Sequence, residues 1–181
     1  MDVSRSSKES PAMPARRWAA LAAAGYVGLF CAVAATAVVW TVAHGSSWAE
    51  QDVVVLAIGL RLVSVAIALA AVSRWGMRLP AWAVLTGLWG AASVQLLYPL
   101  AETVVKGLIA TRVMAPIGKG ISNMSVEGWF NFAATWVIWG VPGALFLVAA
   151  LSYRRPARAR WVLLGIAGGA VTLGGLGVLI G

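Results

Sequence analysis

The sequence predicts an all-α membrane protein: a polytopic bundle of five transmembrane helices with a cytoplasmic amino terminus and an extracytoplasmic carboxyl terminus. Three observations predict this fold: the composition, the number of long apolar segments, and the distribution of basic residues between them. The 181 residues are 61% hydrophobic and 11% charged, and the mean hydropathy is +0.86. Since a soluble domain has about 25% charged residues, we expect most of these apolar side chains to face lipid.

Five segments are long and apolar enough to cross a membrane, since a spanning helix needs about 20 mainly apolar residues. They are residues 18–43, 53–73, 81–101, 128–151 and 161–180. The first segment follows a basic pair, as the core of a signal peptide would, but it exceeds the roughly 7–15 apolar residues of such a core. We therefore expect an uncleaved first span.

The segments outside the spans have different predicted roles. Residues 1–16 contain too few apolar side chains to fold, which predicts a disordered cytoplasmic tail. Residues 17–181 make up the predicted bundle, and residues 102–127 form a long outer loop within it.

The distribution of Lys and Arg sets the predicted orientation, because these residues accumulate in the cytoplasmic connections of membrane proteins. One side of the membrane receives the larger group: Arg5, Lys8, Arg16, Arg17, Arg74, Arg78, Arg154, Arg155, Arg158 and Arg160. The opposite side receives Lys106, Arg112 and Lys119. The larger group therefore marks the cytoplasmic side. The excess of arginine over lysine fits a GC-rich genome, and we expect the plasma membrane of a bacterium.

The sequence offers little for catalysis or metal binding. Cys31 is the only cysteine and His44 the only histidine, so one chain cannot assemble a cysteine–histidine zinc site. There is no GxSxG, P-loop, HExxH or CxxC motif. We expect no catalytic residue, metal or cofactor. The net charge is +8, but the basic residues form short clusters between apolar runs, so we expect no nucleic-acid partner.

Arg61 is the exception inside the second span. It lies nine residues after Asp52, which at 1.5 Å per residue places it roughly 13 Å below the outer surface. An arginine at the centre of a spanning helix costs about 2.5–3.5 kcal/mol, so it usually faces a partner or a wet cavity.

Polar residues in the outer halves of other spans supply candidate partners. Gln95, Tyr98 and Glu102 follow each other at i, i+3 and i+7, which places them on one helical face. Asn131 lies at a similar depth in the fourth span. These residues predict an outward-facing polar pocket with Arg61 at its floor. We favour a structural Arg61–Glu102 pair; the alternative is a site for an anion, a lipid headgroup or a proton.

The last span is rich in glycine, and Gly165 and Gly169 have the four-residue spacing that lets helix backbones approach closely. We expect them to pack against another span of the same chain. A homodimer or another protein partner through this face is the alternative, besides contact with membrane lipids.

Two segments resemble a known group of proteins. "SRWGMRLPAW" (residues 73–82) and "EGWFNFAATWVIWGVPGALFLVAALSYRR" (residues 127–155) are similar to connections and spans of small actinobacterial multi-pass integral membrane proteins. That family has no known function. The resemblance implies a helical membrane bundle, and it assigns no role to any residue.

These observations lead to three functional hypotheses. The first is a non-enzymatic accessory, immunity or assembly component that acts through helix contacts and the outer pocket. The second is a small permease, or permease subunit, for an anionic or amphipathic solute with Arg61 as counter-charge. The third, a lipid-modifying enzyme that uses Glu102 or Glu127 with Arg61, is the weakest, because no nucleophile or metal set is evident.

Overall fold

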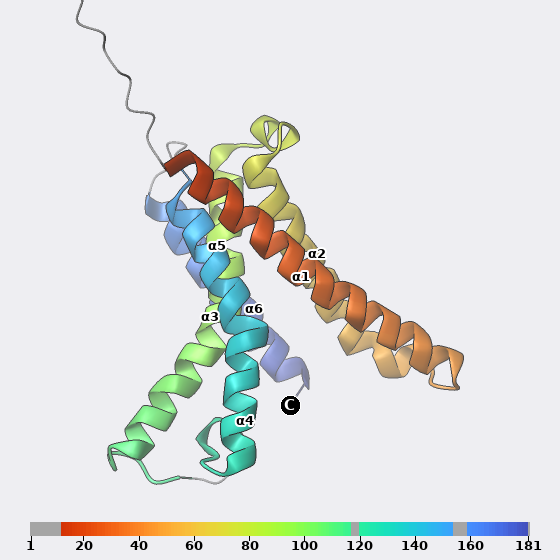
Figure 1. The fold of residues 1–181 in the computed structure, drawn as a ribbon, viewed down its shortest axis with the longest axis vertical. Coiled ribbons are helices and arrows are strands. Elements are labelled where there is room, and N and C mark those ends of the chain that lie inside the picture. The colour runs from red at the N-terminus through yellow and green to blue at the C-terminus, as the bar shows by residue number, and fades with distance from the viewer. Residues whose placement is uncertain (1–11, 117–119, 154–158, 181) are drawn as a thin grey trace, which may run out of the picture.

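The computed structural model describes residues 12–116, 120–153 and 159–180, and every regular element within them is helical (Figure 1). The α-helices are α1 (Ala12–Ala43), α2 (Asp52–Val72), α3 (Ala81–Ala110), α4 (Val126–Thr135), α5 (Val141–Leu151) and α6 (Ala159–Ile180). The short helical turns are η1 (Trp48–Gln51), η2 (Trp75–Arg78), η3 (Gly120–Ser122) and the π-helical η4 (Trp136–Gly140).

Within these residues, four helices are long and apolar enough to cross a membrane. They are Arg17–Ala43 of α1, Asp52–Val72, Ala81–Ala110 and the continuous helix Val126–Leu151 formed by α4, η4 and α5. The part of α6 whose side chains the structure describes, Ala159–Gly175, is also an apolar helix. These lengths and compositions are consistent with a multi-pass membrane protein, whereas the fifth span and the orientation of the termini stay predictions.

Two predicted boundaries are wrong. α1 begins at Ala12, so residues 12–16 of the predicted disordered tail are helical, and residues 1–11 lie outside the described residues. α3 continues to Ala110 instead of ending at residue 101, because no proline follows that position within the helix and the single Gly107 is tolerated there. It stops where Arg112 adopts a positive φ of 61°. The first part of the predicted outer loop is therefore helix.

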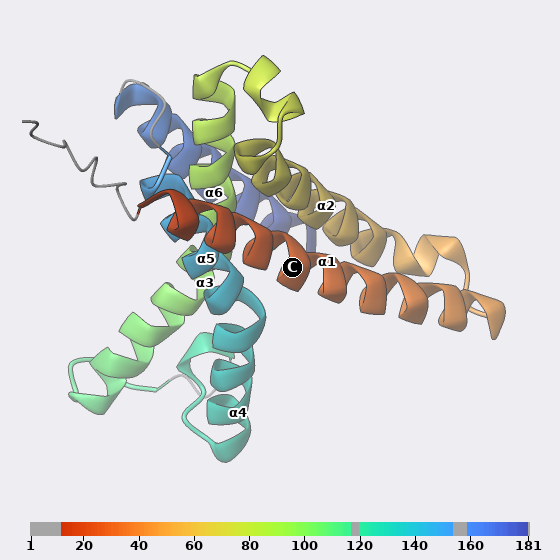
Figure 2. The ribbon, with the colours of Figure 1, turned by 45° about the horizontal axis from the view of Figure 1, so that its top comes forward.

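The helices pack together at one end and diverge at the other. We call the end with the α1–α2 and α3–α4 connections the loop end, and the opposite end the core end. Towards the loop end, α1 and α2 run side by side in one direction, and α3 and α4 run in another (Figures 1 and 2). We call these pairs the first arm and the second arm.

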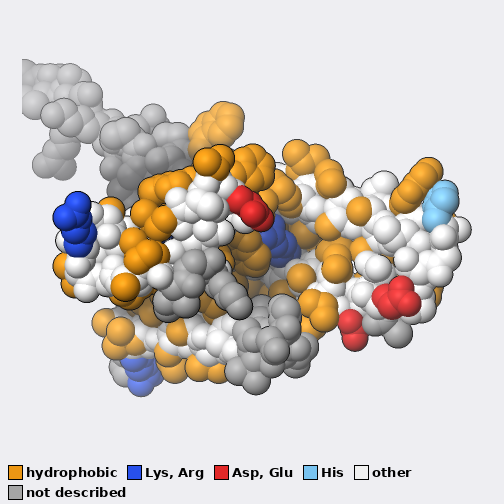
Figure 3. All heavy atoms as spheres, turned by 90° about the horizontal axis from the view of Figure 1, so that it is seen from below, with side chains coloured by type: hydrophobic (Ala, Val, Ile, Leu, Met, Phe, Trp, Pro, Cys, Tyr) orange, Lys and Arg blue, Asp and Glu red, His pale blue; other side chains and the backbone are white. Residues whose placement is uncertain are grey.

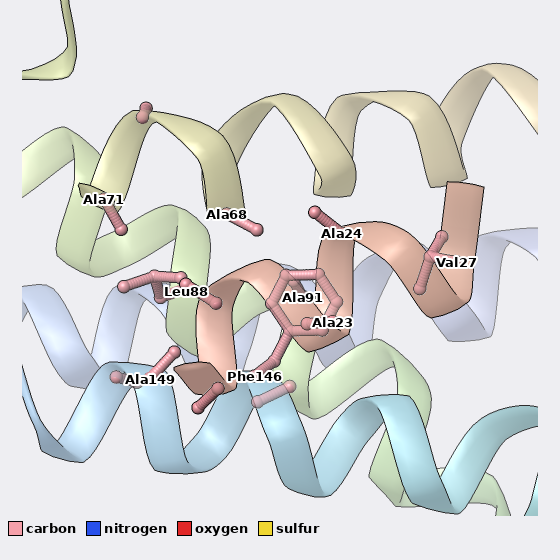
Figure 4. Close-up of a cluster of buried hydrophobic side chains, with 14 of the residues drawn as sticks. Ala23, Ala24, Val27, Ala68, Ala71, Leu88, Ala91, Phe146 and Ala149 are labelled. Atoms are coloured by element: carbon pink, nitrogen blue, oxygen red, sulfur yellow. The ribbon is translucent and has the colours of Figure 1, made fainter. Parts of the chain in front are cut away.

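Small side chains make the core end compact. α1 packs on α2 and α5, and α3 packs on α5 and α6. Alanines from α1, α2, α3 and α5 surround Leu88 and Phe146, which are fully buried (Figure 4). Because an alanine projects only a methyl group, the helix backbones can approach closely. The buried alanines in the close-up include Ala23, Ala24, Ala68, Ala71, Ala91 and Ala149.

The second arm begins where both of its helices are interrupted. α3 contains Pro99, and η4 separates α4 from α5 just before Pro142. Trp136 Nε1, in η4, donates a hydrogen bond at 3.1 Å to Thr103 Oγ1, which lies one helical turn after Pro99. The two interruptions therefore lie next to each other in the helix pair. Proline and π-helical turns are common causes of helix bending.

The π-helical turn leaves one carbonyl without a partner in its own helix. The Val141 N–H donates to Trp136 O, and Pro142, next in the chain, has no N–H to donate to Val137 O. The Tyr26 hydroxyl of α1 donates to Val137 O at 2.7 Å. This bond ties the first arm to the interruption in the α4–α5 helix.

Candidate functional site

A cavity of about 310 Å³ lies between α2, α3 and α6, next to the π-helical turn. Arg61 of α2 lines it together with Gln95 of α3 and Trp139 of η4. Most of the remaining lining is aliphatic or glycine. We call this space the Arg61 cavity. Figure 3 views the loop end, where the surface is largely apolar and one basic side chain lies recessed near its centre.

Arg61 is half-buried and stacks on an aromatic ring. Its guanidinium carbon lies 4.3 Å from the centroid of the Trp139 ring, a geometry in which the ring face attracts the cation. The interruption at η4 places Trp139 in this position, since it lies within the π-helical turn. The ring covers one face of the guanidinium and accepts no conventional hydrogen bond from its five N–H groups.

The predicted Arg61–Glu102 pair is wrong. Glu102 Oε1 lies 3.6 Å from Lys106 Nζ, one helical turn further along α3. Within the described part of the chain, no carboxylate forms an ion pair with Arg61. The reason is the geometry of the arms: Glu102 lies in the second arm, beyond Pro99, whereas Arg61 belongs to the first.

Gln95 is the second unsatisfied polar group at the Arg61 cavity. Its side chain is 3% exposed, and its Nε2 donates to Ala91 O at 3.2 Å. Its Oε1 is buried without a hydrogen-bond partner among the described residues. A buried acceptor in this state costs about 1–3 kcal/mol, which a ligand or a water with a suitable donor would recover.

The other polar groups that line the cavity are satisfied by main-chain carbonyls. The Ser64 hydroxyl donates to Leu60 O at 3.2 Å, and the Thr172 hydroxyl donates to Gly168 O at 2.8 Å. The Thr86 hydroxyl donates to Trp161 O at 3.2 Å. The unmet hydrogen-bonding capacity is therefore concentrated on Arg61 and Gln95.

The five predicted pocket residues do not form one site. Arg61 and Gln95 share the cavity. Tyr98 and Asn131 are exposed, and Glu102 is buried elsewhere, against Lys106. The positions of these polar residues along their helices indicated that they lie at similar depth. They did not indicate that the two arms diverge and so separate Tyr98, Glu102 and Asn131 from Arg61.

Sequence reasoning missed a buried cluster around Lys106. Its ammonium group contacts Glu102, donates to the Asn123 main-chain carbonyl, and lies 5.2 Å and 5.7 Å from the ring centroids of Trp129 and Phe132. The predicted end of the helix at residue 101 assigned Lys106 to a loop. Its spacing of four residues from Glu102 was the signal that could have found the pair.

The glycines of α6 divide into two groups. A Cβ atom at Gly165 would lie 2.6 Å from Thr86 O, and one at Gly169 would lie 2.8 Å from Gly90 O. These two glycines pack against α3, the intramolecular contact expected from their spacing. Gly168 lines the Arg61 cavity, as Gly165 and Gly169 do, but a Cβ at Gly168 would meet nothing within 4 Å.

The acidic, histidine and cysteine side chains of the described residues form no group of three or more that could hold a metal ion. The sequence matches no family model, and no curated protein or solved structure shows significant similarity to it. The resemblance to small actinobacterial membrane proteins stays an expectation. What the chain offers for function is therefore the Arg61 cavity itself.

Proposed function

We propose that this protein is a non-enzymatic accessory, immunity or assembly component of the bacterial plasma membrane that binds an anionic, amphipathic molecule in the Arg61 cavity. One observation carries the proposal: a membrane-length helix presents an arginine to a largely apolar cavity, with no carboxylate in ion-pair distance among the described residues. Intramembrane cations without a structural partner generally mark ligand or ion sites.

The surroundings of Arg61 favour an amphipathic ligand over a small hydrated ion. An anionic group would accept hydrogen bonds from the guanidinium, which the Trp139 ring leaves unsatisfied. The aliphatic and glycine lining would contact the apolar part of the same molecule. Binding sites for small organic ligands usually combine such a lining with a few polar groups.

Substitution of Arg61 tests this proposal. The full-length protein in phosphatidylcholine nanodiscs is titrated with radiolabelled dodecanoate and, separately, with phosphatidylglycerol, one a single-chain and the other a two-chain anionic lipid. We expect Arg61→Gln to weaken binding of at least one of them by about tenfold to a hundredfold, the contribution of hydrogen bonds to a charged group. Arg61→Lys, which keeps the charge, should lose less.

Thermal unfolding of the same samples serves as the control, and we expect Arg61→Gln to remain folded, since Arg61 has no ion pair to break within the described residues. Wild-type protein that binds neither lipid, or a folded Arg61→Gln variant that binds both as tightly as wild type, would contradict the proposal.

A permease or permease subunit for the same class of solute is the second candidate. The interruptions at Pro99 and at η4 favour it, because helices broken beside a binding site recur in transporters. Uptake of dodecanoate into proteoliposomes, compared with binding alone, separates the two roles.

The proposed topology has five spans, with α6 as the last and the amino terminus inside the cell. We expect reporter fusions after Arg78 and Arg160 to be cytoplasmic, and fusions after Ser47, Ser122 and Gly181 to be extracytoplasmic. Alkaline phosphatase and green fluorescent protein report the two compartments with opposite signals. A cytoplasmic carboxyl terminus would show that α6 does not cross the membrane.

A further inference from the structure

The Arg61 cavity has a polar end and an apolar end. Along α2 its lining extends from Ala57 to Ile67, which is about 15 Å of helix. Gln95 is the lining residue of α3 nearest the loop end, and Arg61 lies near the middle of the α2 lining. The side chain of a helical residue leans towards the amino terminus of its helix, which for α2 is the loop end. Towards the core end the lining includes Ile67, Gly87 and Leu164, which carry no polar side-chain atom, and Thr86, whose hydroxyl already donates to Trp161 O. An occupant would therefore place its charged group towards the loop end and its apolar part towards the core end.

Glycines form one side of the cavity. Gly87 and Gly90 of α3 and Gly165 and Gly168 of α6 all line it. At Gly168 the space above the backbone is open, because a Cβ there would meet nothing within 4 Å. At about 30 Å³ for a water-sized group, the volume of about 310 Å³ holds on the order of ten such groups. That is room for one alkyl chain inside the cavity, and a second chain of the same molecule would have to lie outside it, in the bilayer.

The cavity can be reached from the side of the bundle. α6 packs on α3, while α2 packs mainly on α1. The α2 side chains at the cavity, Leu60 and Val63, are exposed, and so is Leu164 on α6. In a membrane these exposed apolar residues contact hydrocarbon, so a molecule already dissolved in the bilayer can move into the cavity laterally.

We propose that the occupant of the Arg61 cavity is a single-chain anionic amphiphile of the fatty-acid type. Its carboxylate accepts hydrogen bonds from Arg61, and its alkyl chain extends along the glycines of α3 and α6 towards the core end. This inference rests on the proposed function. It adds the number of alkyl chains in the ligand, the orientation of the ligand in the cavity and its lateral route of entry from the bilayer.

A variant at Gly168 tests the path of the chain. In phosphatidylcholine nanodiscs, Gly168→Leu should weaken dodecanoate binding by about tenfold or more, because the added side chain occupies the space of the alkyl chain. Val63→Trp should do the same from the α2 side. Gly174→Leu is the matched control, since a Cβ at Gly174 also meets nothing within 4 Å but Gly174 does not line the cavity. Dodecanol, which lacks the charge, should compete poorly with dodecanoate.

Several results would overturn the inference. The first is a folded Gly168→Leu variant that binds dodecanoate like wild type. Another is displacement of dodecanoate by phosphatidylglycerol, which would assign the site to a two-chain lipid. If Arg61→Gln weakens phosphatidylglycerol binding while Gly168→Leu does not affect dodecanoate, the proposed function holds and the single-chain assignment fails. If Arg61→Gln changes the binding of neither lipid, both fail.

Discussion

Replacing Lys106 with Met should lower the free energy of unfolding by about 3–5 kcal/mol, the largest change we expect from any single substitution. Lys106 and Glu102 are 2% and 4% exposed, so removal of the ammonium leaves a buried carboxylate without its partner. The substitution also removes the hydrogen bond to the Asn123 carbonyl, which holds the segment before α4 against α3. Unfolding by SDS titration in mixed micelles measures the loss.

The double variant Glu102→Met with Lys106→Met should recover most of that loss, because no buried charge remains uncompensated. A residual deficit should persist, since the Asn123 carbonyl still lacks its donor. Arg112→Met, which removes an exposed cation from the same connection, is the control and should change the free energy of unfolding by less than about 0.5 kcal/mol. Equal losses in the single and the double variant would show that Lys106 and Glu102 are not coupled.

Gly169→Leu should be the second most damaging substitution. A Cβ at Gly169 would lie 2.7 Å from the Ser93 Cβ and 2.8 Å from Gly90 O, so α6 could remain on α3 only if the backbones moved apart. Overpacking of this kind costs about 1–3 kcal/mol and sometimes more. Gly165→Leu should have a similar effect, because its Cβ would approach Thr86 O. The unfolding temperature in detergent reports both.

Gly168→Leu and Gly174→Leu complete this series on the same helix. Neither Cβ would meet an atom within 4 Å, so both should unfold near the wild-type temperature. A similar loss of stability in all four variants would show that glycine is required by the α6 backbone itself and not by its contact with α3.

The composition and the lengths of the apolar segments predicted the helical architecture well, because each span consists of nearly uninterrupted apolar residues between polar connections. The close contact of Gly165 and Gly169 with a helix of the same chain also followed from their spacing. Helix ends were less predictable. Residues 102–110 are polar enough to leave a membrane but contain no proline, and Gly107 is the single residue among them that strongly disfavours a helix, so hydropathy and helix propensity indicate different boundaries.

The candidate site was only partly predictable, for a geometric reason. Depth in the membrane can be counted from the sequence, and Arg61 and Gln95, which were placed at similar depth, line the same cavity. Lateral position cannot be counted in the same way. The breaks at Pro99 and η4 direct α3 and α4 away from α2, which separates Glu102 and Asn131 from Arg61. The partner of the carbonyl that the π-helical turn leaves unpaired is Tyr26, more than a hundred residues away in the sequence.

The hydrogen bond from Tyr26 to Val137 has a consequence for how the chain is assembled. During synthesis α1 reaches the membrane first, and the helix with the π-helical turn follows much later. Until that helix meets α1, Pro142 leaves one carbonyl of the helix without an N–H donor, and this is Val137 O while the π-helical turn is formed. An unsatisfied carbonyl in hydrocarbon costs several kcal/mol. The isolated helix therefore enters the membrane with one main-chain hydrogen bond unmade. Docking against the already inserted α1 supplies the missing donor.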